Sequence, residues 1–305
     1  MKRLITLLLL VVAGATLAFA QQTEVATFAS ECQPSEALTN RKPVTSKWSL
    51  FTGEANFANH YLNNHEYSGE INGFEAIHGR YFRKSNRLSW RLTLTHLRNM
   101  HRKMLSTGGL KNPAGTSIMS VQTYEVDYAL FYDWTFFDRL QLRAGGSLNL
   151  YGGLNGCING HSINNVLSID LHTQIYGAAQ IRYGWNFKKF GLDLYANVST
   201  PLLGIMFVNG RYESFFESIY NLPLTAKGYN HTQFSSFHNM QGANGEVGID
   251  FALRSNVSLS FGVGFYNRYW TAHQLQNYRK NTVLKVGLSV DLVSLKRSAV
   301  SSRKF

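Results

Sequence analysis

The chain has 305 residues, with 30 Lys or Arg against 18 Asp or Glu, and its formal net charge is therefore +12. Charged residues make up only 16% of the chain, whereas Tyr numbers 16, Phe 20 and Gly 26. No recognisable nucleic-acid-binding module accompanies the basic charge, so we exclude nucleic acid as a partner and expect anionic lipid to supply the counter-charge. After residue 20 no uninterrupted apolar run approaches 18 residues, which excludes a transmembrane helix.

The N-terminus is typical of an exported protein. Lys2 and Arg3 precede the apolar run 4–19, and Ala18-Phe19-Ala20 has the small–x–small form that a signal peptidase cleaves. We therefore expect a cleaved signal peptide over 1–20 and a mature chain that begins at Gln21. Residues 21–46 are polar and unpatterned, and we interpret them as a mobile periplasmic leader.

From residue 47 onward the dominant pattern is alternation with a period of two. Over residues 167–185 one parity is apolar and the other is polar or small. Such a strand would be roughly 60 Å long, whereas ordinary strands run about five or six residues. The same alternation recurs over 124–134, 140–150, 190–198, 247–253, 257–265 and 284–292, and further strands are expected at 47–60, 68–83 and 88–94.

The connections between these strands alternate in length, which favours an antiparallel up-and-down barrel. Tight turns are expected at 83–88, 136–139, 186–191 and 254–256, and long connections at 60–68, 104–118, 154–165, 205–241 and 269–281. We predict an all-β transmembrane barrel of about 10 strands (8–12) over 47–292, with both mature termini periplasmic. Cys32 and Cys157 then fall on opposite sides of the membrane and form no disulfide. The alternative is a soluble lipocalin-like barrel, whose apolar face would be inside.

Two sequence features resemble the integral outer-membrane β-barrel superfamily. Tyr124 and Trp134 lie on one face ten residues apart, about 25 Å along the membrane normal, which is the spacing of the two aromatic girdles of these barrels. Lys285-Val286-Gly287-Leu288-Ser289-Val290-Asp291-Leu292 resembles their C-terminal insertion signal, although a basic tail, 293–305, follows it here. The resemblance implies insertion by the barrel assembly machinery and residence in the bacterial outer membrane.

The interior face of such a barrel would carry acids and bases together. About ten strands enclose little space, so we expect most of these side chains to pair in a structural network. A small-solute pore is the alternative. The expected interior charges are Glu125, Asp127, Asp133, Arg143, Asp170, Arg182, Asp193, Glu246, Asp250, Arg268 and Lys285.

Two enzyme families with this architecture offer candidate catalytic residues. Asp170-x-His172 resembles one half of the omptin-type protease site, and Glu125-x-Asp127 resembles the other. Measured from the lower aromatic girdle, Asp127 and His172 would differ in height by about 15 Å, too far to share one water.

Outer-membrane phospholipases use a His followed closely by Ser, and FSSFHNMQGANG (234–245) has its serines before His238, so the order of that family is not reproduced. Histidine pairs such as His60/His65 have a spacing that places partners on opposite faces of a strand, so we expect neither a metal nor a cofactor.

The long connection 205–241 contains an amphipathic pattern. Its apolar residues recur at helical spacing from Tyr212 to Tyr220, so we predict a helix over 210–220 with Phe215 and Phe216 facing the barrel. This helix would pack on the rim or act as a lid.

Basic residues gather near the ends of strands, at Arg98, Arg102, Lys103 and Lys111, and at Arg268, Arg279 and Lys280. They would either solvate the surface or contact lipopolysaccharide phosphates.

Taken together, these patterns favour a non-enzymatic, monomeric outer-membrane barrel that interacts with lipid, glycan or protein through its extracellular loops. The alternatives are a small-solute pore and an outer-rim hydrolase, either omptin-like or phospholipase-like.

Overall fold

A computed structural model describes residues 45–62, 66–81, 86–102, 118–136, 139–158, 167–187, 190–207, 231–254, 257–272 and 274–291. The predicted signal peptide, leader, helix over 210–220 and basic tail therefore lie outside the described residues. Within the described part, no helix is long and apolar enough to cross a membrane.

The described residues form eleven β-strands that begin at Thr45 and end at Asp291, close to the predicted limits of the barrel. Most strands have 15 to 20 residues, and β8 has only 5. The strands are β1 (Thr45–Asn59), β2 (Glu66–Tyr81), β3 (Asn86–Arg102), β4 (Ile118–Phe136), β5 (Leu140–Ile158), β6 (Leu167–Asn186), β7 (Gly191–Phe207), β8 (Thr232–Ser236), β9 (Met240–Arg254), β10 (Val257–Ala272) and β11 (Leu275–Asp291).

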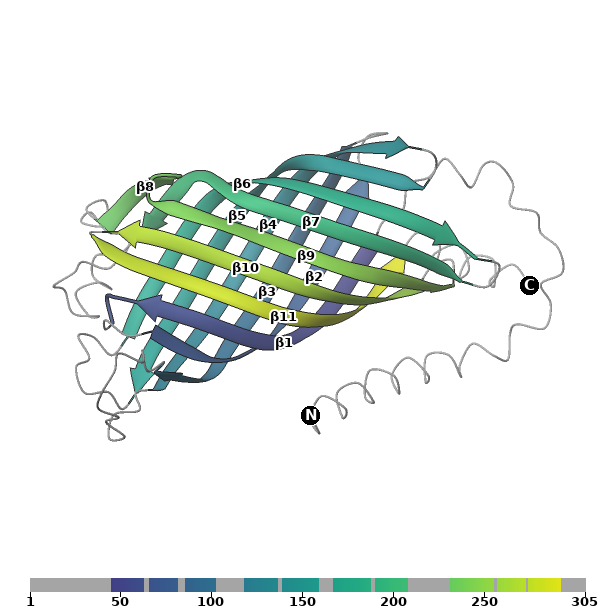
Figure 1. The fold of residues 1–305 in the computed structure, drawn as a ribbon. Helices are drawn as coiled ribbons and strands as arrows, with labels where there is room; N and C mark the ends of the chain where they lie inside the picture. Colours follow the sequence, from purple (N-terminus) through teal and green to yellow (C-terminus); the bar gives the residue numbers. More distant parts are fainter. Residues whose placement is uncertain are drawn as a thin grey trace, which may run out of the picture. The chain divides into compact units, whose positions relative to one another are not determined.

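The strands close into an antiparallel barrel (Figure 1). Except for β8 and β9, each strand pairs with its neighbour in the chain, and the pairing of β1 with β11 joins the first strand to the last. Ten strands complete the ring, because β7 pairs with β9 along its first half and with the short β8 along its second half. The prediction of an up-and-down barrel of about ten strands is confirmed.

The register fixes how steeply the strands run. A row of paired residues that starts at Tyr124 on β4 passes through Leu94, Phe74, Leu50, Val286, Phe261, Ile249, Leu194, Tyr183 and Leu140, and returns to β4 at Phe136. The row thus comes back 12 residues further along the strand (136 − 124). A stagger of that size over ten strands tilts them by about 40°, within the usual range of closed barrels.

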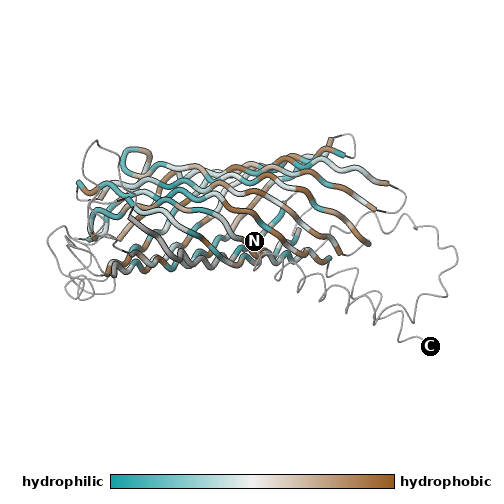
Figure 2. Tube along the Cα trace, turned by 60° about the horizontal axis from the view of Figure 1, so that its bottom comes forward, coloured by the Kyte–Doolittle hydropathy of each residue, from teal (hydrophilic) through white to brown (hydrophobic). Residues whose placement is uncertain are grey.

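The outer wall is apolar and the interior is polar, as predicted and opposite to a soluble barrel. On β4 the outward Tyr124 and Tyr128 are each 55% exposed, whereas Thr123 and Asp127, which point inward, are 1% and 5% exposed. The same parity holds on β10, where Phe261 is 41% exposed and Ser260 is 2% exposed. Figure 2 shows this alternation as brown and teal segments along the strands.

One predicted connection is wrong. The long connection expected over 269–281 is instead strand on both sides of a tight turn, since β10 continues to Ala272 and β11 starts at Leu275. The outward residues near this turn include Thr271 and Gln276, and they are polar. Strands that extend beyond the hydrocarbon face water, so the alternation that revealed the other strands fades here.

The end of the barrel where β1 finishes, here called the upper end, is filled by apolar side chains. We call this cluster the apolar cap. It comprises Phe57, Tyr61, Leu62, Tyr67, Ile71, Met119, Val121, Met206, Met240, Trp270, Ala272 and Leu275. Phe57, Leu62 and Tyr67 are 0% exposed, so the cap packs as tightly as the core of a soluble domain.

Candidate functional site

Below the apolar cap, a chain of ion pairs crosses the interior. Arg91 on β3 lies 2.8 Å from Asp127 on β4 and 3.8 Å from Glu75 on β2. Lys285 on β11 lies 3.0 Å from Glu75 and 2.6 Å from Glu246 on β9. We call these five residues the ionic chain. It joins one side of the barrel wall to the other. Four of its members are buried, and the Arg91 side chain is partly exposed.

The ionic chain continues toward the lower end. The Tyr195 hydroxyl donates a hydrogen bond to Glu246 at 2.8 Å and accepts one from Lys47 at 3.1 Å. Lys47 also lies 3.7 Å from Asp250, which pairs with Arg182 at 2.8 Å. The predicted network of opposite charges is therefore present in the interior.

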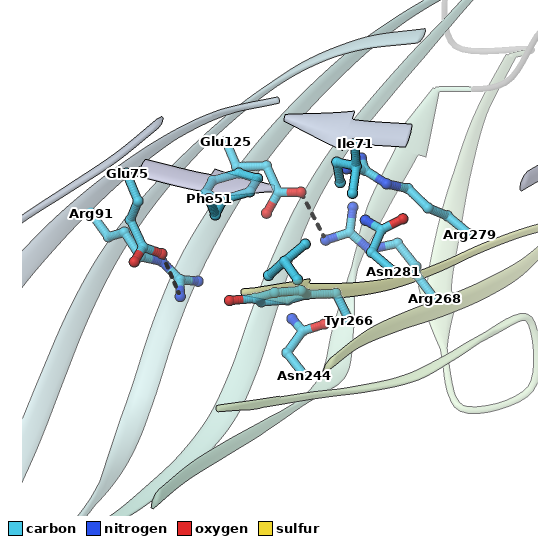
Figure 3. Close-up of a pocket in the computed structure, with 11 residues that line it drawn as sticks. Phe51, Ile71, Glu75, Arg91, Glu125, Asn244, Tyr266, Arg268, Arg279 and Asn281 are labelled. Atoms are coloured by element: carbon cyan, nitrogen blue, oxygen red, sulfur yellow. Dashed lines mark ion pairs between the residues drawn. The ribbon is translucent and has the colours of Figure 1, made fainter. Parts of the chain in front are cut away.

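Between the ionic chain and the apolar cap lies a partly open cavity. Eleven side chains line it (Figure 3). Its charged lining consists of three guanidinium groups, from Arg91, Arg268 and Arg279, and two carboxylates, from Glu75 and Glu125. Glu75 is also bonded to Lys285, so the part of the cavity near Arg268 and Arg279 carries an excess of positive charge.

The predicted Asp-x-His pair does not form a catalytic dyad in the described part of the chain. Asp170 accepts a hydrogen bond from Asn155 at 2.5 Å. His172 is only 4% exposed, packs between the rings of Tyr151 and Trp270, and has no hydrogen-bond partner at either ring nitrogen among the described residues. An imidazole without a carboxylate at one of its nitrogens lacks the partner that would orient and polarise it as a general base.

The register bears on the expected difference in height between the two halves of this candidate site. The register aligns Glu125, Tyr151 and His172 in one row across β4, β5 and β6, and Asp127 lies two residues from Glu125 on its strand. In a barrel tilted by about 40°, a paired row climbs about 3 Å per strand, here toward the upper end from β4 to β6. His172 therefore lies about 11 Å higher than Asp127, and the two halves stay at different heights. Asp127 is also engaged by Arg91 and Asn149.

Arg268 was expected both among the interior charges and with the basic residues near the strand ends, and the structure places it inside the barrel. It shares the inward parity of Tyr266 and Trp270, is 8% exposed, and lies 3.8 Å from Glu125. Grouping it with Lys280 by nearness to a strand end neglected this parity.

Lys280 faces outward and is exposed, with its ammonium group 5.2 Å from the ring centres of both Tyr269 and Tyr278. The backbones of Arg98 and Arg102 lie on β3. Lys103, Phe215 and Phe216 lie outside the described residues.

The serine-rich stretch near β8 divides between the two faces of the wall. Ser235 points inward and is bonded to Gln174 at 2.7 Å. Ser236 points outward, and its hydroxyl lies 2.6 Å from Nδ1 of His238 on the exposed turn that follows. No group of three His, Cys, Asp or Glu in the described ranges is arranged to hold a metal ion.

Sequence reasoning missed the interior charges Lys47, Glu75 and Arg91. It also wrongly grouped Arg279 with the basic residues near the strand ends, whereas Arg279 is 7% exposed and lines the interior cavity. Arg91 and Arg279 could have been found, because each has the parity opposite to outward apolar residues on its own strand. Lys47 and Glu75 lie on β1 and β2, whose outward faces carry few apolar residues, so their alternation is weak.

A closed antiparallel barrel with an apolar outer wall and a charged interior is the architecture of integral outer-membrane barrels. Three solved structures are similar in fold. Neisserial surface protein A has 12% identity and a TM-score of 0.33, covering 81% of this chain and 97% of that one. An outer membrane channel from Pseudomonas putida F1 has 10% identity and a TM-score of 0.36, covering 85% and 99%. The outer membrane protease OmpT from Escherichia coli has 10% identity and a TM-score of 0.41, covering 88% and 100%.

No curated protein sequence matches this chain. A family model described as a protein of unknown function (DUF3316) matches residues 3–299. Because this match spans nearly the whole chain, the protein belongs to the DUF3316 family.

Proposed function

We propose that this protein is a closed, non-conducting outer-membrane barrel that acts through its upper rim on lipid, glycan or protein outside the cell. The observation that carries the proposal is the ionic chain, in which Lys285 bonds carboxylates from β2 and β9 across the interior. A pore needs a continuous wet path, and this one would have to pass both the ionic chain and the apolar cap.

The upper rim offers a contact for membrane phosphates. Lys280 projects from the outer wall beside Tyr269 and Tyr278, and its charge is exposed. Aromatic side chains sit at the headgroup level of outer-membrane barrels, and an ammonium group at that level pairs with lipid phosphate. This supports lipopolysaccharide as a partner of the rim.

Planar bilayers test the proposal directly. We expect the purified barrel to produce no single-channel steps, whereas a general porin inserted under the same conditions gives regular ones. Heat-modifiable mobility on a gel establishes that the inserted protein is folded. Steps of pore size from the folded wild-type barrel would contradict the proposal and favour the channel alternative.

A second candidate function, hydrolysis at the outer wall, rests on the contact between Ser236 and His238. A hydroxyl bonded to an imidazole is the minimal nucleophile–base pair, and this one is on the lipid-facing side beside Phe234 and Phe237. Short serine contacts within turns are also common without catalysis. Phospholipid hydrolysis by the wild-type barrel that is lost in Ser236→Ala, but not in Ser235→Ala, would favour this function over the first.

A further inference from the structure

The cavity between the ionic chain and the apolar cap has a side on which the positive charge is only partly compensated. Arg268 donates one hydrogen bond to the Tyr176 hydroxyl at 3.0 Å, and its nearest carboxylate, Glu125, is 3.8 Å away. Arg279 donates to the Thr123 hydroxyl at 3.1 Å. With the Asn281 amide oriented to satisfy both groups, Arg279 also donates from Nη2 and Nε to the Asn281 side-chain oxygen at 3.0 and 2.8 Å. No carboxylate in the described part of the chain is within ion-pair distance of Arg279. Because a guanidinium has five N–H donors, Arg268 keeps most of its donors, and Arg279 keeps the remainder, for another acceptor.

The cavity also adjoins polar atoms that lack partners. Arg268 lies 4.5 Å from the ring centre of Tyr151, and the Tyr151 ring contacts that of His172. Tyr151 and His172 are each 4% exposed, and neither the hydroxyl nor the two ring nitrogens has a hydrogen-bond partner among the described residues. Buried groups of this kind require bound water or a ligand, because leaving them unpaired is costly.

The barrel wall beside the cavity is interrupted. The ladder between β7 and β9 ends at Ser199 and Asn244, and Asn244 lines the cavity. The ladder between β7 and β8 starts only at Leu203, so Thr200, Pro201 and Leu202 have no ladder partner on that side, where the chain is fully described. We call this break the seam. Pro201 lacks a backbone N–H, and β7 carries a bulge against β6 at the same level.

The seam lies within the lipid-facing band. Val198, just below it, is 53% exposed, and Leu203 and Ile205, just above it, are 44% and 52% exposed. Phe234 and Phe237 flank it from the β8 side and are 60% and 57% exposed. A side-chain hydrogen bond runs across the break from the Thr200 hydroxyl to the Gly242 carbonyl oxygen at 2.9 Å. The wall is therefore held together less firmly here than where the ladder is continuous.

We propose that the cavity binds the anionic head of a single lipid, a carboxylate or phosphate held by Arg268 and Arg279, and that the lipid enters from the membrane through the seam. Arginine suits this role because its planar donors match the two oxygens of such a group. The acyl chain would extend through the seam between Leu203 and Phe237 into the surrounding hydrocarbon. This proposal does not depend on whether the barrel conducts.

Binding of radiolabelled palmitate, and separately of radiolabelled inorganic phosphate, to the detergent-purified barrel tests the proposal. We expect palmitate to bind and its affinity to fall at least tenfold in the double variant R268Q/R279Q. Arg143→Gln is the matched control, since Arg143 is also 8% exposed but lies outside the cavity lining. Asn281→Asp is a second variant that places a carboxylate beside Arg279, and it should weaken palmitate binding while keeping the arginines.

The outcomes separate the sources of the anion. Palmitate binding that depends on Arg268 and Arg279, with no competing phosphate binding, supports the lipid and its route through the seam. Phosphate binding without palmitate binding overturns the lipid proposal in favour of a free anion from water. Absence of both, or equal loss of palmitate binding in Arg143→Gln among variants that all keep heat-modifiable mobility, also overturns it.

Discussion

At the scale of single residues, the parity of a residue along its strand determines whether a charged side chain points into the barrel or away from it. Arg268 and Lys280 are both basic and lie near the upper ends of adjacent strands, yet one points inward and the other outward. Arg268 is held among Glu125 and the interior tyrosines, whereas Lys280 is exposed beside two outward rings. A charge inside the barrel must be paired, because transferring it unpaired from water into a low-dielectric interior is costly.

Lys285 is the residue at which this pairing matters most. It is 5% exposed and bonds Glu75 and Glu246, so Lys285→Met leaves two buried carboxylates facing each other with less compensation. We expect the free energy of unfolding to fall by about 3–5 kcal/mol, measured by urea titration of the barrel in detergent with tryptophan fluorescence. The outward Lys280→Met should change it by less than about 0.5 kcal/mol. Equal effects of the two substitutions on the free energy of unfolding would contradict the assignment of Lys285 to the interior and of Lys280 to the outer wall.

At the scale of strands, the barrel is built from elements longer than a bilayer requires. β5 has 19 residues and β6 has 20, whereas about 9–11 suffice to cross a membrane. The excess length carries the apolar cap at the upper end. The β10–β11 hairpin shows the same extension and closes through a tight turn, in which Gln274 has a φ of 65°. That is the left-handed region, which costs energy for any residue with a Cβ.

Glycine at position 274 should relieve this cost. We expect Gln274→Gly to raise the free energy of unfolding by about 0.5 kcal/mol, the relief of the left-handed backbone being partly offset by the greater freedom of glycine in the unfolded chain. Gln276→Gly, two residues further along in β11, should instead lower it by about 0.5–1 kcal/mol. The same urea titration compares the two variants, and a loss of stability in both would show that the turn is not strained at Gln274.

At the scale of the whole molecule, the barrel reverses the usual distribution of polarity. Its outer wall carries exposed aromatic and aliphatic side chains, while acids and bases are paired inside. The interior is crossed by the ionic chain, and the apolar cap fills the upper end. Between these two layers lies the cavity lined by the arginines that define the proposed lipid site.

Many of the strands and their lipid-facing sides could be predicted from sequence, because alternation with a period of two can be recognised within a single stretch of the chain. The alternation from Tyr124 to Trp134 identifies both the strand and its lipid-facing side without knowledge of any neighbour. The arrangement of the interior could not be predicted in the same way. Whether Glu125 meets Arg268, or shares a paired row with His172, depends on the stagger of paired rows around the whole ring, which is a non-local property. The seam lies where β7 changes its pairing partner from β9 to β8, and no local sequence pattern indicates where this change occurs.

The most direct test of the inside-out barrel is a nitroxide scan along β4 in lipid bilayers. Single spin labels at each position from Tyr124 to Trp134 report collisions with oxygen, which concentrates in the hydrocarbon. The account predicts high oxygen accessibility at the even positions, such as Tyr128 and Leu130, and low accessibility at the odd ones, such as Asp127 and Ala129, with a period of two throughout. Equal accessibility at both parities, or high accessibility at the odd positions, would contradict it.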